Sequence, residues 1–293
     1  MRKVAIVTGA SRGIGKAICA HLALKGYAVV VTARTVNPGD ITGYPGTIGE
    51  TAKLVESLGS EAIAVKCDVG IEDDIRATVA QAIDRFGRVD LMVNNARYDG
   101  PAMWELYTNM DWREIRKAVE CNALAPMLFA HLLLPHMTKQ GVGVILNVTT
   151  GLEGLLENEA LPGQGATSLM YPTSKAMLVW FTRTLAKETR EANIAVIGFQ
   201  PGPTLVERAT VEPPKGFNLA RRHSVHMPSV LAAYLASHPN PMEFNGQIID
   251  PAHEFVVERG LMTSEQIAKP FKDGEVYEPF QEPYWMELTA ARG

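Results

Sequence analysis

Short apolar segments alternate with amphipathic segments along most of this chain, and no other sequence feature constrains the fold as strongly. The apolar segments carry Val and Ile at consecutive positions, as strands buried on both faces require. Strands that alternate with helices predict an α/β fold with a doubly wound parallel sheet between two helical layers. The predicted strands are Val4–Thr8, Ala28–Ala33, Ile63–Asp68, Val89–Asn94, Val144–Val148, Ile194–Phe199 and Gln247–Asp250.

Length and composition fit one large domain with a C-terminal extension. The chain has 293 residues, of which 46% are hydrophobic, and this is ample material for a single core. We expect residues 1–253 to form the domain and residues 254–293 to pack on it or on a neighbouring subunit. A net charge of −4 argues against nucleic acid or an anionic membrane as the main partner.

The cysteines and apolar runs bear on the cellular compartment. Cys19, Cys67 and Cys121 have a spacing that fits neither a disulfide framework nor a zinc site, so we expect reduced thiols and no metal. The first apolar run is too short for a signal peptide, and Pro126 and His131 interrupt the longest later run. A cytoplasmic protein without a membrane span is therefore expected.

The first predicted strand ends in a glycine-rich turn, which leads into an amphipathic helix. Glycines allow positive φ angles and a close backbone approach to a pyrophosphate. The helix N-terminus adds unpaired N–H groups and the positive end of its dipole. Because a strand precedes the turn and a helix follows it, the turn predicts a dinucleotide site. The turn residues predicted to bind are Gly9, Ser11, Arg12, Gly13, Ile14 and Gly15.

The Gly-x-x-x-Gly-x-Gly spacing of this turn resembles the short-chain dehydrogenase/reductase family. Further motifs follow in the family's order over residues 1–250, and a set in the right order is more specific than any single motif. The resemblance implies a Rossmann-type single domain and an oxidoreductase that uses a nicotinamide cofactor. The matching residues are Asp68 and Val69, Asn95 and Ala96, Asn122, Tyr171 and Lys175, and Pro201 and Gly202.

The end of the second predicted strand bears on which nicotinamide cofactor is bound. A cofactor with a free 2′-hydroxyl usually meets an acidic residue there, whereas this strand is followed by Arg34. Arg34 and Arg12 could both form charge-assisted hydrogen bonds with a 2′-phosphate, although either could equally be a solvated surface residue. We therefore expect NADP(H) to be preferred over NAD(H).

Tyr171 and Lys175 are four residues apart and share one face of a predicted helix. A free phenol has a pKa of about 10, and a nearby ammonium favours the phenolate. In the family, this Tyr exchanges a proton with the substrate oxygen, and the Lys also holds the ribose hydroxyls. The resemblance therefore implies that Tyr171 is the general acid/base and that Lys175 tunes it.

Several positions depart from the family pattern. Thr150 stands at the place of the catalytic Ser, and Thr149 is an alternative to it. Arg97 replaces the Gly that usually follows Asn-Asn-Ala. The usual Thr after Pro-Gly is missing, and Thr204 is a candidate to hydrogen-bond the carboxamide instead. Asn122 would support a water chain from Lys175, as the resemblance implies.

The sequence predicts the substrate and the partners only as broad classes. The segment Leu205–Met227 stands where the family has its substrate-covering loop, and we expect an apolar carbonyl compound or alcohol. The long loop after the second strand is similar to that of the hydroxysteroid-dehydrogenase-like branch. The resemblance also implies a homodimer or homotetramer. Two alternatives stay open: a catalytically silent NADP(H)-binding sensor or scaffold, and a redox-neutral isomerase or lyase.

Overall fold

The computed structural model describes residues 2–40, 44–151, 167–207, 222–269 and 278–290. Within these residues, seven parallel strands form one sheet in the order β3-β2-β1-β4-β5-β6-β8. Every predicted strand is present, with small shifts at some ends. The strands are β1 Val4–Thr8, β2 Ala28–Ala33, β3 Ala62–Lys66, β4 Leu91–Asn94, β5 Gly143–Val148, β6 Ile194–Phe199 and β8 Ile248–Ile249.

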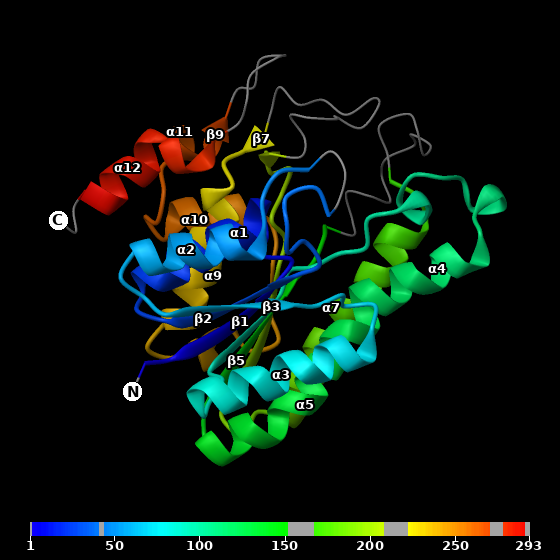
Figure 1. Ribbon diagram of the computed structural model, residues 1–293, viewed down its shortest axis with the longest axis horizontal. Helices are drawn as coiled ribbons and strands as arrows, with labels where there is room; N and C mark the ends of the chain where they lie inside the picture. The colour runs from blue at the N-terminus through cyan, green and yellow to red at the C-terminus, as the bar shows by residue number, and fades with distance from the viewer. Residues whose placement is uncertain (1, 41–43, 152–166, 208–221, 270–277, 291–293) are drawn as a thin grey trace.

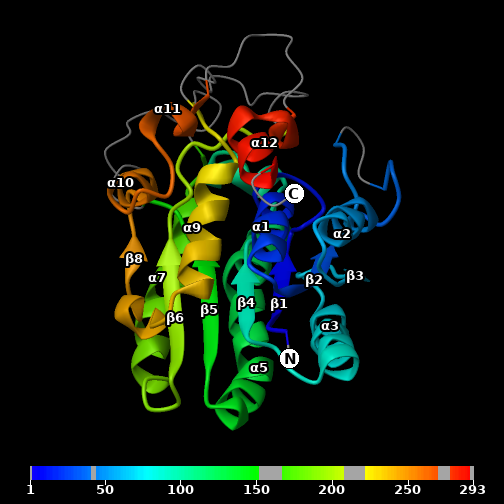
Figure 2. The ribbon, with the colours of Figure 1, turned by 90° about the vertical axis from the view of Figure 1, so that its left-hand side faces the viewer.

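Helices cover both faces of this sheet, which confirms the predicted three-layer, Rossmann-type α/β fold (Figures 1 and 2). The two faces are packed by separate hydrophobic clusters. On one face lie α1 Gly13–Leu24, α2 Ile48–Ser57, α9 His226–Ser237 and α10 Ala252–Glu258. On the other face lie α3 Glu72–Phe86, α5 Ala125–Gln140 and α7 Met170–Glu188.

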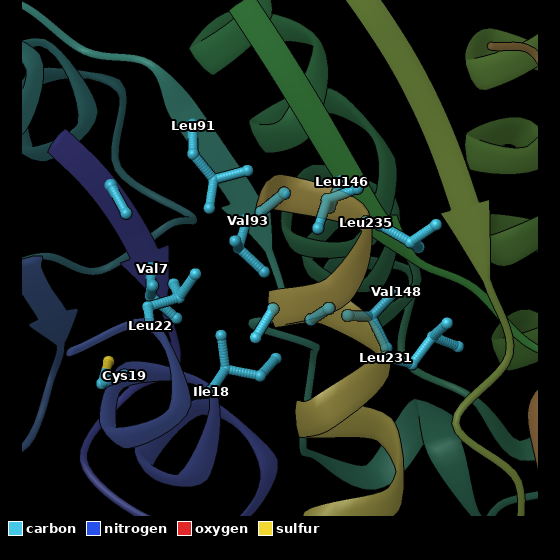
Figure 3. Close-up of a cluster of buried hydrophobic side chains, with 14 of the residues drawn as sticks. Val7, Ile18, Cys19, Leu22, Leu91, Val93, Leu146, Val148, Leu231 and Leu235 are labelled. Carbon is cyan, nitrogen blue, oxygen red and sulfur yellow. The ribbon is translucent and has the colours of Figure 1, made fainter. Parts of the chain in front are cut away.

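The cluster under α1 and α9 shows why the strands are apolar at consecutive positions. Figure 3 shows Ile18 of α1 and Leu231 of α9 beside Val93 and Leu146 of the sheet. All four side chains are fully buried. Alternate residues of the same strands, such as Ile145, point to the opposite cluster. The central strands therefore bury both faces, as predicted.

The edge strand β3 differs from that prediction. It pairs with β2, and among the described residues no strand lies on its other side. Val65 is buried, whereas Ala62 and Ile63 are only half-buried and Lys66 is exposed. The expectation of burial on both faces is wrong here, because a strand at the edge of the sheet is covered by fewer neighbours.

A long helical run precedes β5. It comprises α4 Trp112–Val119, a π-helical turn η3 Glu120–Leu124, and α5. By length and composition alone this run could cross a membrane, with a window of mean hydropathy 1.3, which is weak evidence for a span. Buried core helices pass the same test, and in this run Phe129 and Leu133 pack against the sheet.

In the described part of the C-terminal extension, helix α12, Pro283–Ala290, lies against α1 (Figure 2). Its Trp285 is 5% exposed and packs against Ala20 and Leu24. Beneath it, Nε2 of His21 lies 3.1 Å from Nδ1 of His226. The remaining described elements are η1 Pro101–Met103, η2 Tyr107–Asn109, β7 Arg222–His223, η4 Pro241–Phe244, α11 Ser264–Ile267, β9 Ala268–Lys269 and η5 Pro279–Gln281.

Candidate functional site

The candidate site lies where the parallel strands end. In such a sheet, ligands bind beyond the carboxyl ends of the strands, at the point where the strand order reverses. Here β1 lies between β2 and β4, so this rule predicts a ligand site beyond the ends of β1 and β4. The turn after β1, the Asn-Asn-Ala segment after β4 and the start of α7 beside β5 all belong to this edge.

The glycine turn after β1 has the backbone that its sequence predicts. Gly9 and Gly13 have φ angles of +65° and +55°, a region that side chains disfavour. A Cβ atom on Gly15 would lie 2.3 Å from the Gly9 carbonyl oxygen, so only glycine lets the helix start this close to the strand. The turn therefore presents bare backbone at the start of α1.

Thr8 joins the ends of β1 and β4, a link that the sequence motifs do not reveal. Its Oγ1 accepts hydrogen bonds from the backbone N–H groups of Asn95 and Ala96, each at 3.0 Å. Nδ2 of Asn95 donates to the Thr8 carbonyl oxygen at 2.8 Å. The sequence sign of this link is Thr8 itself, a polar residue at the end of an apolar strand. These bonds fix Asn95 and Ala96 beside the glycine turn.

The N-terminus of α1 holds a carboxylate of the protein itself. The backbone N–H of Gly13 donates to Oε2 of Glu207 at 2.9 Å. A carboxylate oxygen and a phosphate oxygen are both anionic acceptors, so Glu207 stands in for the anion that this turn is predicted to bind. The turn therefore fits the pyrophosphate of a dinucleotide, and Glu207 would have to give up this bond.

Arg12 is fixed at the end of β2. Its guanidinium donates to the Pro45 carbonyl oxygen at 2.7 Å and to the Oγ1 atom of Thr35 at 3.1 Å. Arg34 is half exposed, and its Nη1 atom lies 4.0 Å from the Asp68 carboxylate. Both guanidinium groups thus lie at the carboxyl end of β2, with Asp68 close to Arg34.

Tyr171 and Lys175 stand on the first turns of α7. Lys175 is 2% exposed, and its Nζ donates to the carbonyl oxygen of Val148, the last residue of β5, at 2.6 Å. The Tyr171 side chain is only half-buried, and its hydroxyl has no hydrogen bond within the described residues. The phenol therefore remains available to a substrate.

Burial, and secondarily the positive charge of Arg97, lower the pKa of Lys175 to about 7. An ammonium loses its hydration in this position, and the Val148 carbonyl supplies a single acceptor in return. Lys175 can therefore change its protonation state near neutral pH.

The two candidate threonines after β5 differ in their surroundings. Thr149 is 1% exposed, and among the described residues its Oγ1 has no hydrogen-bond partner. Thr150 is half-buried. Only Thr150 therefore combines the family's position with access from outside the protein.

Asn122 and Thr204 already use their side chains within the protein. Oδ1 of Asn122 accepts from the Tyr98 N–H at 2.7 Å, and its Nδ2 donates to Oγ of Ser174 at 2.9 Å. Each of these bonds uses one of two positions, so a second N–H and a second lone pair of this amide remain for a water chain. The Thr204 hydroxyl donates to the Pro201 carbonyl at 2.8 Å, which leaves its lone pairs to accept from a carboxamide.

This fold and site define a nucleotide-binding oxidoreductase. A family model described as short chain dehydrogenase matches residues 3–214, and the chain belongs to that family, whose members use a nicotinamide cofactor. The chain is similar to the 7alpha-hydroxysteroid dehydrogenase of Escherichia coli, with 33% identity over 205 residues, 70% of this chain and 72% of that protein. It is also similar to the 3-oxoacyl-(acyl-carrier-protein) reductase of Synechocystis, with 31% identity over 250 residues, 84% of this chain and 93% of that protein.

Solved structures resemble this fold over most of the chain. A metagenomic short-chain oxidoreductase in complex with NADP matches with a TM-score of 0.65 and 26% identity, and the match covers 84% of this chain and 95% of that one. The hydroxysteroid dehydrogenase from Escherichia coli matches with a TM-score of 0.68 and 30% identity, over 84% of this chain and 94% of that one.

The lowered pKa of Lys175 predicts that stability rises with pH. Between its folded pKa of about 7 and its unfolded value of about 10.4, the unfolded chain keeps a proton that the folded protein lacks. Urea unfolding without cofactor should therefore show a wild-type free energy of unfolding that increases with pH relative to Lys175→Met. The exposed Lys187→Met on the same helix is the matched control. A pH-independent difference between wild type and Lys175→Met would contradict the lowered pKa.

Proposed function

We propose that this short-chain dehydrogenase interconverts a carbonyl and an alcohol on an apolar substrate with NADP(H), and that Tyr171 is its general acid/base. One observation supports this most directly. The Tyr171 hydroxyl has no protein hydrogen bond among the described residues, and it lies one helical turn before Lys175, which is buried on the end of β5. A scaffold needs neither feature, and the relatives described above are named as dehydrogenases or reductases, so we retain neither alternative.

When bound, the cofactor would supply the hydride, and residues of the protein would hold the cofactor in place. In our proposal, the glycine turn binds the pyrophosphate, Asn95 and Ala96 lie beside it, and Lys175 donates to the ribose hydroxyls. Asp68 and Val69 would face the adenine, and Pro201, Gly202 and Thr204 would face the carboxamide.

The proposed proton chemistry uses three side chains. In the reductive direction, Tyr171 donates its proton to the carbonyl oxygen as the hydride arrives at the carbon. The Thr150 hydroxyl donates to the same oxygen and orients it. Protonated Lys175 stabilises the phenolate that remains on Tyr171 until solvent returns the proton. Oxidation of an alcohol follows the reverse order.

The surroundings of Tyr171 favour an apolar substrate body. Tyr171 packs against a separate hydrophobic cluster that contains Met103, Met170 and the partly buried Trp104. Thioether side chains adapt to irregular apolar surfaces, and aromatic rings add a large apolar area. Much of the predicted substrate-covering segment, residues 208–221, lies outside the described residues.

Replacement of the Tyr171 hydroxyl tests the proposed chemistry. Tyr171→Phe should lower kcat/KM for NADPH-dependent reduction about 10²- to 10⁴-fold, because positioned proton transfer contributes that much. NADPH binding should change little. The measurement is NADPH oxidation over a panel of apolar aldehydes and ketones, with Tyr234→Phe on α9 as the control. Full activity of Tyr171→Phe would overturn the proposal.

The preference for NADP(H) is supported by the placement of two cations. Arg12 and Arg34 both lie at the end of β2, where no carboxylate belongs to the strand itself. Charge-assisted hydrogen bonds to a 2′-phosphate would favour NADP(H) over NAD(H).

The double variant Arg12→Gln, Arg34→Gln tests this preference. The ratio of kcat/KM with NADPH to that with NADH should fall at least about tenfold, since each charged hydrogen bond contributes about 1.5–3 kcal/mol. Glu207→Ala is the contrasting variant. It removes an anion from a site that both cofactors share, so it should strengthen the binding of both and leave the ratio unchanged. An unaltered ratio in the double variant would refute the assignment.

We also propose a homodimer, or a tetramer built from such dimers, through α7 and the neighbouring turn η3. Leu124, Met177 and Trp180 are exposed there, and Trp180 is 68% exposed. Such a patch of large apolar side chains is typical of an interface. Sedimentation velocity should show an oligomer that Trp180→Glu dissociates and that Met286→Glu, exposed on α12, does not. A monomeric wild type would contradict this.

The compartment is likewise a proposal. All three cysteines are free thiols, two of them buried, which fits a reducing cytoplasm. Fractionation of cells that express the protein would test this, and recovery outside the cytoplasm would contradict it.

A further inference from the structure

Arg97 places a guanidinium at the carboxyl end of β4. It follows Asn95 and Ala96, whose backbone N–H groups are fixed by Thr8, so the position of its Cα atom is well defined by the sheet. Its side chain is exposed. The family pattern has a glycine here, so the side chain is an addition to the common site.

The side-chain hydrogen bond that the structure gives Arg97 is a weak one. Nη1 donates to the thioether sulfur of Met103, a neutral and poor acceptor. Among the described residues, no carboxylate lies within ion-pair distance of Arg97. The cations on the helix that follows are paired: Arg113 lies 2.6 Å from the Asp111 carboxylate, and Lys117 lies 2.7 Å from the Glu114 carboxylate.

The location of Arg97 relates it to the reacting groups. Its positive charge contributes, after burial, to the lowered pKa of Lys175. Its partner Met103 belongs to the same apolar cluster as Met170 and Tyr171. The guanidinium therefore lies on the substrate side of Tyr171, whereas the proposed phosphate sites are at Gly13, Arg12 and Arg34.

We propose that Arg97 binds an anionic group of the substrate, so that the substrate is a carbonyl compound or alcohol with an apolar body and a carboxylate. This inference rests on the proposed function. A guanidinium binds a carboxylate through two parallel N–H···O bonds. The same anion would also offset the repulsion between Arg97 and protonated Lys175, because it brings negative charge to Arg97.

The test compares keto acids with their neutral esters. The substrates are benzoylformate, 3-benzoylpropionate and 4-acetylbenzoate, each beside its methyl ester, with NADPH oxidation as the readout. We expect the wild type to prefer at least one acid over its ester. Arg97→Gln should lower kcat/KM for that acid about 10- to 100-fold, mainly through KM, and change the ester less than twofold. Arg97→Lys should retain part of the preference, and Arg113→Gln, an exposed arginine of α4, is the control.

A binding measurement makes the test independent of turnover. Calorimetry of the NADPH-bound protein with each acid and its primary amide should show tighter binding of an acid, and Arg97→Gln should abolish that difference. The proposal is overturned if neither assay shows a preference for an acid, or if Arg97→Gln weakens acids and esters equally. A loss of NADPH affinity in Arg97→Gln, with acid preference intact, would assign the anion to the cofactor instead.

The proposed roles of Tyr171 and Arg97 can be refuted independently of each other. Full activity of Tyr171→Phe would overturn the proton-transfer role and leave the acid preference in place. Turnover that depends on Tyr171 but ignores the carboxylate would overturn only the role of Arg97.

Discussion

The buried hydrogen bond from Lys175 Nζ to the Val148 carbonyl joins helix α7 to the carboxyl end of β5, and the geometry of the candidate site depends on it. One residue earlier on the strand, Nδ2 of Asn147 donates to Oγ1 of Thr182 at 2.8 Å, so the same helix is held at a second point. Because Tyr171 precedes Lys175 by one turn, these two bonds determine where its hydroxyl stands. Buried, satisfied polar contacts of this kind specify one arrangement of a helix on a sheet.

The cofactor side of the site is organised by backbone rather than by side chains. Thr8 ties the residues after β4 to the end of β1, and Gly15 lets α1 begin directly above that strand. The backbone N–H of Gly13 donates to Glu207, which follows β6 in the chain. If the glycine turn binds the pyrophosphate as proposed, the pyrophosphate and Glu207 would compete for this donor, and cofactor binding would be linked to the segment after Gly202.

The surroundings of Tyr171 combine positive charge with apolar surface. Lys175 and Arg97 place two cations near Tyr171, and burial makes the ammonium of Lys175 costly. Around them lie Met103 and Met170, which offer apolar surface. A substrate with an apolar body and an anionic end would match both the positive charge and the apolar surface near Tyr171.

The sequence by itself determined the strands, the glycine turn and the Tyr171–Lys175 pair, because each depends on residues close together in the chain. Consecutive apolar residues predict a central strand, and a spacing of four predicts one helical face. Other features depended on which distant segments meet. Only the tertiary structure showed that β3 is an edge strand, that Thr149 is buried while Thr150 is accessible, and that Glu207 reaches Gly13. The physical reason is that burial, ion pairing and shifted pKa values arise from contacts between remote residues, and local sequence patterns do not record those contacts.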